Sequence, residues 1–294
     1  MDSPFKADIL KGKVALVTGG GSGIGFEITR QLGLHGAKIV ISGRREKVLQ
    51  AAVAELSGQD ISIQYVQGDV RSYDSCEKMV AEAAQHFGRL DILVNCAAGN
   101  FLSPAEQLSS NGFRTVIDID TIGTFNMSRA AFAELKKSGD AIIINISMTL
   151  HYGATWYQAH ASAAKSAVDS LTRSLALEWG SYGIRVVGVA PGPIKGTPGM
   201  TKLAPGEAER MEALSASQVP LGHMGEKWDI AMGCVFLTSR AAKYVSGTTL
   251  VVDGAEWLYK RPVVPRETVA QMARAVESKS RAVGIAGAAA KSKL

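Results

Sequence analysis

The chain has 294 residues, of which 46% are hydrophobic and 20% charged, and this composition is typical of a globular protein with a sizeable core. Its 32 basic and 27 acidic residues give a net charge of +5 without a basic run, which argues against nucleic acid as a partner. No apolar run approaches the roughly 20 residues that span a bilayer. The three cysteines are far apart, which indicates a reducing compartment and predicts no metal site.

The first element of the chain is a strand, a glycine-dense turn and a helix. Val14 to Val17 are four apolar residues in a row, typical of a buried strand, and Ile24, Ile28 and Leu32 then recur at helical spacing. The glycines between them spell T-G-x-x-x-G-x-G rather than G-x-G-x-x-G. A glycine turn without a ligand is the alternative, but its position between strand and helix favours a phosphate site.

Strand-like and helix-like segments alternate along the rest of the chain. Strands are predicted over 38–42, 61–66, 90–95, 141–147, 184–190 and 250–252, and helices over 45–56, 72–87, 111–137 and 160–182, with Ser72 as a cap. This alternation predicts an α/β fold, a doubly wound (Rossmann) parallel sheet of about seven strands with helices on both faces. Ligands are then expected beyond the carboxyl ends of the strands.

The domain organisation follows from composition. No linker interrupts the chain before about residue 258, so residues 1–258 are expected to form one domain, with a proline- and glycine-containing lid over about 197–222. Residues 259–294 form a C-terminal extension with a short helix over 267–277. It closes with Ser292-Lys293-Leu294, which predicts a peroxisomal location and the peroxisomal import receptor as a partner.

The second strand is followed by Ser42-Gly43-Arg44-Arg45, without the carboxylate that holds the ribose of NAD. A guanidinium there can bind a 2′-phosphate, worth about 1.5–3 kcal/mol, which predicts NADP(H) as the cofactor. The two arginines might instead only begin a helix, but basic charge at that end opposes the helix dipole.

These motifs, with Asp69-Val70, Asn95-Cys96-Ala97-Ala98-Gly99 and Pro191-Gly192-Pro193-Ile194, resemble the short-chain dehydrogenase/reductase family over residues 12–255. Thr197 matches the family's threonine position with a shift of one residue. The resemblance implies cofactor contacts from Gly19, Gly21, Ser22, Gly23, Ile24, Gly25, Arg44, Asp69, Val70, Asn95, Ala97, Lys165, Pro191, Gly192 and Ile194.

Three of the family's four catalytic positions differ here. Lys165 is retained, but Ala161 stands at the tyrosine position, Met148 at the serine position and Asp120 at the asparagine position. Reduction of a ketone produces an alkoxide that needs a proton on oxygen, which is the task of the tyrosine. Hydride addition to the δ carbon of a 2,4-dienoyl thioester instead produces a dienolate, which is protonated on carbon. Asp120 and Lys165 are therefore predicted to hold the proton-donating water.

The same departures resemble the branch of the family that reduces 2,4-dienoyl-CoA in peroxisomes. That resemblance implies an acyl-CoA substrate and a homo-oligomer, by analogy a tetramer. It places Arg44, Arg71 and Lys202 near phosphates and Phe101 near the acyl chain.

Several alternatives stay open on the sequence. The chain could reduce a 2-enoyl-CoA or 3-oxoacyl-CoA, or be a catalytically silent NADPH-binding protein. Arg71 and Lys202 could be solvated surface charges. Tyr157, eight residues before Lys165, could be a displaced acid if the helix extends that far. Packing near the substrate pocket or at a subunit contact is favoured for both Trp156 and Tyr157. A structural or solvent-facing role is favoured for His151 and His160.

Overall fold

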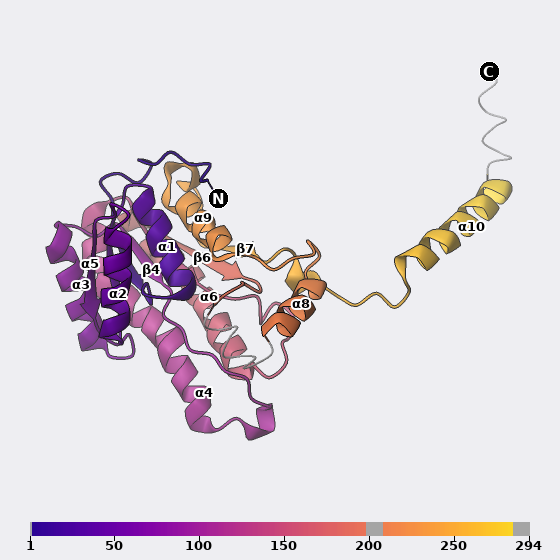
Figure 1. Ribbon diagram of the computed structural model, residues 1–294, viewed down its shortest axis with the longest axis horizontal. Helices are drawn as coiled ribbons and strands as arrows, with labels where there is room; N and C mark the ends of the chain where they lie inside the picture. Colours follow the sequence, from indigo (N-terminus) through magenta and orange to yellow (C-terminus); the bar gives the residue numbers. More distant parts are fainter. Residues whose placement is uncertain (1, 198–207, 285–294) are drawn as a thin grey trace, which may run out of the picture. The chain divides into compact units, whose positions relative to one another are not determined.

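A computed structural model describes residues 2–197 and 208–284. Seven parallel strands form one sheet in the order β3-β2-β1-β4-β5-β6-β7 (Figure 1). They are β1 (Val14–Thr18), β2 (Lys38–Gly43), β3 (Ile63–Gln67), β4 (Ile92–Asn95), β5 (Ala141–Ile146), β6 (Ile184–Pro191) and β7 (Thr249–Val252). The prediction of a doubly wound parallel sheet is confirmed.

The α-helices are α1 (Gly23–Leu34), α2 (Glu46–Ser57), α3 (Tyr73–Phe87), α4 (Ser110–Val116), α5 (Gly123–Ser138), α6 (Ala159–Trp179), α8 (Ala208–Gln218), α9 (Lys227–Thr238) and α10 (Arg266–Gly284). A π-helical segment, η2 (Ile117–Ile122), joins α4 to α5, and 3₁₀ turns lie at η1 (Ala105–Gln107), η3 (Gly180–Tyr182), η4 (Arg240–Ala242) and η5 (Glu256–Leu258). No helix of the described residues is long and apolar enough to cross a membrane.

Two apolar cores cover the two faces of the sheet, because alternate strand residues point to opposite sides. Ala15 and Val17 pack with α1, α2 and α9 on one face. Leu16 packs with α3, α5 and α6 on the other. Both cores consist of side chains that are almost fully buried, which accounts for the unbroken apolar runs of the strands.

Most sequence predictions of single elements are confirmed within two residues at each end. Ser72 caps α3, since its hydroxyl accepts a hydrogen bond from the Ser75 amide. The helix predicted over 111–137 contains the π segment, which the sequence did not indicate. The sequence reading also missed α9, a helix that is apolar nearly all round because it packs against α1 and the sheet.

The terminal part of the chain forms a separate unit. Contacts divide the chain into Met1–Trp257 and Leu258–Leu294. The helix predicted over 267–277 is longer, Arg266–Gly284. The predicted lid contains α8 and otherwise lies partly outside the described residues, as do Lys202 and Ser292 to Leu294.

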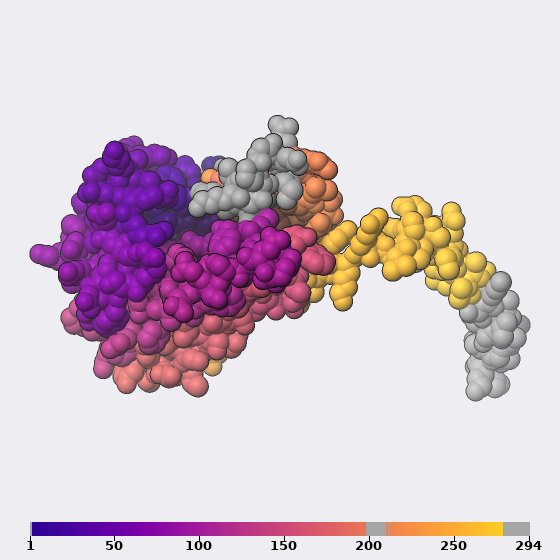
Figure 2. Space-filling model, turned by 90° about the horizontal axis from the view of Figure 1, so that it is seen from below, coloured from indigo at the N-terminus to yellow at the C-terminus, as the bar shows by residue number. Residues whose placement is uncertain are grey.

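The strand order reverses between β1 and β4, which pair with each other through residues Ala15–Thr18 and Ile92–Asn95. In open α/β sheets the ligand site lies beyond the carboxyl ends of the strands at such a reversal. In the space-filling view of Figure 2, the indigo and violet N-terminal residues lie beside the magenta residues from the middle of the sequence on the surface of the first unit.

Candidate active site

The glycine turn between β1 and α1 leaves no room for side chains. Gly19 has φ = +67°, and a Cβ atom there would lie 3.1 Å from the Cys96 carbonyl oxygen. A Cβ atom on Gly25 would lie 2.5 Å from the Gly19 oxygen. Ser22 makes no side-chain cap for α1, and within the described chain the N–H groups of residues 21 to 24 have no acceptor. This cradle fits the phosphates of a dinucleotide.

The ends of β1 and β4 are held together by Thr18. Its buried hydroxyl accepts hydrogen bonds from the amides of Cys96 (3.0 Å) and Ala97 (3.1 Å). Asn95 is also buried, and its side-chain amide donates to Ser128 Oγ (3.0 Å) and Asn145 Oδ1 (2.9 Å). The side chain of Asn95 therefore ties strands to helices beneath the site.

Arg44 lies just beyond the end of β2 and is exposed. Its carbonyl oxygen accepts a hydrogen bond from Gln67 Nε2 (2.9 Å), which fixes the main chain. In the described part of the chain, its guanidinium has no hydrogen bond or ion pair. The group is therefore available to a phosphate, as the sequence predicted for this position.

Asp69 and Arg71 form an ion pair after β3. Arg71 Nε lies 3.0 Å from both carboxylate oxygens of Asp69. Hydrogen bonds from Arg71 hold the pKa of Asp69 below its usual value, against an opposing effect of burial. Val70, between them, is buried against Gly123. Arg71 is thus a paired cation rather than a free surface charge.

The centre of the site is a buried ion pair. Lys165 Nζ on α6 lies 3.0 Å from Asp120 Oδ2, and the two residues are 5% and 1% exposed. Lys165 also donates to the Ile146 carbonyl at the end of β5 (3.0 Å), and Asp120 Oδ1 accepts from the Gly99 amide (2.7 Å). The sequence could not predict these two main-chain partners, because every residue has the same main-chain groups and no residue type marks the ones that are used.

The π-helical segment explains how Asp120 reaches Lys165. Asp120 lies within η2, where the extra residue per turn shifts the side chains that follow relative to a continuous α-helix. Thr124 donates to the Asp120 carbonyl (2.6 Å), and Thr121 donates to the Ala164 carbonyl of α6 (3.2 Å). The segment is therefore fastened to α6 beside Lys165.

Apolar side chains fill the space around the position where the family has its tyrosine. Ala161 is 1% exposed and forms a small apolar cluster with Val116 and Ala164, against which Ile117 and Leu150 pack. Met148 is half-buried at the serine position. Neither position supplies a hydroxyl to the site.

The loop after β4 meets the loop before α6. Asn100 Nδ2 donates to Gln158 Oε1, and the Ser103 amide donates to the Tyr157 carbonyl (2.9 Å). The Phe101 ring stacks on that of His160 with 4.4 Å between centroids.

The predictions for Tyr157 and Trp156 concern the start of α6. Because α6 begins at Ala159, Tyr157 lies outside the helix and does not share a helix face with Lys165. Trp156 is 81% exposed in the single chain, and its packing near the substrate pocket or at a subunit contact stays a prediction.

The segment after β6 follows the predicted turn. A Cβ atom on Gly192 would lie 2.5 Å from the Asp253 Cβ atom, so glycine is required there. Pro191 ends the strand, and the buried Ile194 forms an isolated bridge with Gly225. The turn is therefore fixed beside the ends of β6 and β7.

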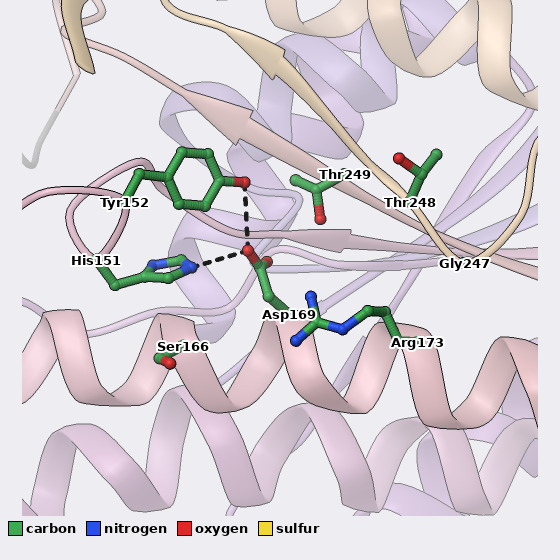
Figure 3. A pocket seen from close by; sticks show the side chains of 8 residues that line it. All are labelled: His151, Tyr152, Ser166, Asp169, Arg173, Gly247, Thr248 and Thr249. Atoms are coloured by element: carbon green, nitrogen blue, oxygen red, sulfur yellow. Dashed lines mark hydrogen bonds and ion pairs between the residues drawn. The ribbon is translucent and has the colours of Figure 1, made fainter. Parts of the chain in front are cut away.

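A separate pocket of about 390 Å³ lies along α6, lined by His151, Tyr152, Ser166, Asp169, Arg173, Gly247, Thr248 and Thr249. Figure 3 shows His151 and Tyr152 pointing toward Asp169, to which they lie at 2.9 Å (Nε2–Oδ2) and 3.3 Å (OH–Oδ2). Burial raises the pKa of Tyr152 to about 12, so the phenol stays protonated. His151 belongs to this cluster and not to the Asp120–Lys165 pair.

Within the described chain, no group of acidic, histidine and cysteine residues could hold a metal ion.

A family model described as enoyl-(acyl carrier protein) reductase matches residues 19–254. The chain belongs to the short-chain dehydrogenase/reductase family, whose fold implies a nicotinamide cofactor. It is 58% identical over 291 residues to a peroxisomal 2,4-dienoyl-CoA reductase [(3E)-enoyl-CoA-producing] of Arabidopsis thaliana, covering 96% of this chain and 97% of the relative. It is 46% identical to the protein of that name from Danio rerio, covering 86% and 84% of the two chains.

A crystal structure of a short chain dehydrogenase from Bacillus anthracis superimposes with a TM-score of 0.76 at 39% identity, over 85% of this chain and 98% of the other. A probable 2,4-dienoyl-CoA reductase [(2E)-enoyl-CoA-producing] of Bacillus subtilis is 41% identical, covering 85% and 98%. The chain thus resembles reductases whose names specify two different products.

Proposed function

We propose that this chain reduces 2,4-dienoyl-CoA to (3E)-enoyl-CoA with NADPH. The names of the relatives at 46–58% identity support this substrate and product. The observation that carries the proposal is the buried Asp120–Lys165 pair beside a tyrosine position that Ala161 fills. Such a pair in place of a phenol suits protonation on carbon rather than on oxygen.

When bound, the cofactor would supply a hydride to the δ carbon of the dienoyl group. The negative charge on the substrate would then spread over the conjugated chain to the thioester oxygen, and the α carbon would take up a proton. Lys165 has three N–H donors, of which one contacts Asp120 and one the Ile146 carbonyl. The third can donate to a water molecule, which would give a proton to the α carbon and take one from the Lys165 ammonium, while Asp120 holds that ammonium in place.

The preference for NADPH rests on Arg44. Its guanidinium, without a partner among the described residues, suits the 2′-phosphate, and arginines rather than a carboxylate occupy the two positions directly after the strand. Gly19 to Gly25 hold the diphosphate in this proposal, and Asp69, Val70, Asn95, Ala97, Pro191, Gly192 and Ile194 form the rest of the cofactor site.

We assign the substrate side of the site to Arg44, Arg71, Phe101 and Lys202. The first two are cations whose charges both act on Asp69, and Phe101 exposes 38% of its surface near α6, where it can contact an acyl chain. Peroxisomal location follows from Ser292-Lys293-Leu294 and from the names of the relatives, through the import receptor. A homotetramer is proposed by family analogy.

The experiment is an NADPH oxidation assay with a 2,4-dienoyl-CoA, a 2-enoyl-CoA and a 3-oxoacyl-CoA. We expect turnover of the dienoyl substrate and far less of the other two. Folded, NADPH-binding protein that turns over none of the three would show a silent nucleotide-binding protein instead. Import is tested by deletion of Ser292 to Leu294, after which the protein should remain outside peroxisomes.

A further inference from the structure

His160 is a completely buried imidazole that the proposed proton delivery does not use. It is the second residue of α6, next to Ala161 and five residues before Lys165. Neither ring nitrogen has a hydrogen bond of good geometry in the described part of the chain. Because a buried polar atom without a partner costs about 1–3 kcal/mol, such an orphan in a site requires an explanation.

The surroundings of His160 favour the neutral imidazole. Burial lowers its pKa, against smaller opposing effects of the Phe101 main chain and the Asp120 charge. The first turn of a helix also disfavours a cation, since the N-terminal end of the helix dipole is positive. A neutral imidazole carries one N–H donor and one acceptor nitrogen.

The ring also lies beside the predicted reacting groups. The Asp120 charge acts on it, and the half-exposed Phe101 ring stacks over it at 4.4 Å. A rotation of the Phe101 side chain toward an acyl chain would uncover the ring. No hydroxyl at residue 161 or 148 is present to contact the substrate oxygen.

We propose that His160 is a catalytic residue whose ring N–H donates a hydrogen bond to the thioester oxygen of the substrate. The inference rests on the proposed dienoyl-CoA reduction. As hydride reaches the δ carbon, the electron pair moves along the chain to this oxygen, where the His160 hydrogen bond stabilises the negative charge. His160 transfers no proton, since the α carbon receives its proton through Lys165. A neutral histidine that polarises a carbonyl from a helix N-terminus has a precedent in triosephosphate isomerase.

The test uses His160→Phe, which removes the donor, and His160→Asn, which retains one. We expect His160→Phe to lower kcat for the dienoyl-CoA about 10²–10³-fold, the usual effect of removing an oxyanion donor. Its NADPH affinity should not change, and His160→Asn should recover part of kcat. The control is His35→Asn, which alters a buried histidine that hydrogen-bonds Ser3 and Gln31.

A second readout does not depend on turnover. In the complex with NADP⁺, which cannot donate hydride, wild-type protein should shift the absorption band of bound 2,4-dienoyl-CoA to longer wavelength, because a polarised carbonyl withdraws electrons from the diene. His160→Phe should abolish this shift, and His160→Leu, which also lacks a donor, replaces it in both assays if the phenylalanine variant does not fold. Wild-type kcat or an undiminished band shift in a folded donor-free variant would overturn the role of His160. Inactive wild-type protein would contradict the proposed function itself.

Discussion

Two buried carboxylates at opposite edges of the sheet have very different partners. Asp91, just before β4 at the amino edge, accepts hydrogen bonds from the Val14 amide (2.9 Å), from Arg89 Nε (2.8 Å) and from Ser138 Oγ. Asp120, near the carboxyl edge, accepts from the Gly99 amide and pairs with the buried Lys165. Both side chains are almost fully buried, at 0% and 1% exposure.

The different partners suit Asp91 to stabilising the fold and Asp120 to taking part in the proposed reaction. The donors around Asp91 come from three places in the chain, Val14, Arg89 and Ser138, and contact both oxygens of its carboxylate, and its cation partner Arg89 is half-exposed. Lys165 is buried with its partner and retains an N–H donor for a ligand. A buried ion pair contributes little net stability, so the Asp120–Lys165 pair is better explained by the proposed proton delivery than by stabilisation of the fold.

The largest expected effect comes from breaking the carboxyl-edge pair. Lys165→Ala and Asp120→Ala should each lower kcat/KM for the dienoyl-CoA by about 10²–10⁴-fold, because proton delivery to the α carbon is lost. Steady-state kinetics with NADPH measure the effect. Full activity in Asp120→Ala would remove the aspartate from the mechanism.

The next effect concerns the cofactor. Arg44→Ala should raise the Kd of NADPH about 10–100-fold, since a charge-assisted contact contributes about 1.5–3 kcal/mol, and leave the Kd of NADH nearly unchanged. Fluorescence titration with both nucleotides measures this. Lys47→Ala, on the exposed surface of α2, is the matched control. Equal losses for the two nucleotides would exclude a 2′-phosphate contact.

Asp91→Asn should instead affect stability, with kcat unchanged. We expect a loss of about 1–3 kcal/mol in the free energy of unfolding, because the charged partner of Arg89 is removed. Although burial raises the pKa of Asp91, hydrogen bonds from Arg89, Ser138 and Val14 lower it further, so the net pKa is depressed. The carboxylate therefore stabilises the fold above about pH 4, and this stabilisation is lost as the pH falls through the folded-state pKa. Denaturation with urea at neutral pH and near pH 3 should show a smaller effect of Asp91→Asn in acid. An equal effect at both values would contradict the ionised state.

The smallest effect is expected from restoring the family's tyrosine. Ala161→Tyr should not increase ketone or dienoyl reduction, because the site packs Val116 and Ala164 where the ring would lie. Overpacking should cost about 1–3 kcal/mol of stability, measured by thermal denaturation. Ala163→Tyr, at an exposed position of α6, is the control. A gain of ketone reductase activity would show that the missing tyrosine alone determines which substrate is reduced.

The sequence predicted the sheet and most helices because strands buried on both faces are unbroken apolar runs and the helices have an apolar period of 3.6. It also identified Asp120 and Lys165, which the structure brings within 3.0 Å. It could not indicate the π segment that positions Asp120, since six residues are too few to show a period of their own. The burial of His160 depends on Phe101, 59 residues earlier in the chain, and such long-range packing leaves no local signal.

The Asn95 side chain has partners that its motif did not indicate. Its place in the segment Asn95 to Gly99 predicts a cofactor contact, and this stays a prediction. The structure adds that the side-chain amide donates hydrogen bonds to Ser128 and Asn145 in a buried network, and partners so far away in the sequence leave no local signal.

The most direct test of the account is the position of the solvent proton in the product. Reduction of a 2,4-dienoyl-CoA with NADPH in deuterium oxide, followed by NMR of the product, should place deuterium at the α carbon of a (3E)-enoyl-CoA. Deuterium at the γ carbon of a (2E)-enoyl-CoA, the product in the name of the Bacillus subtilis relative, would contradict proton delivery to the α carbon by Asp120 and Lys165.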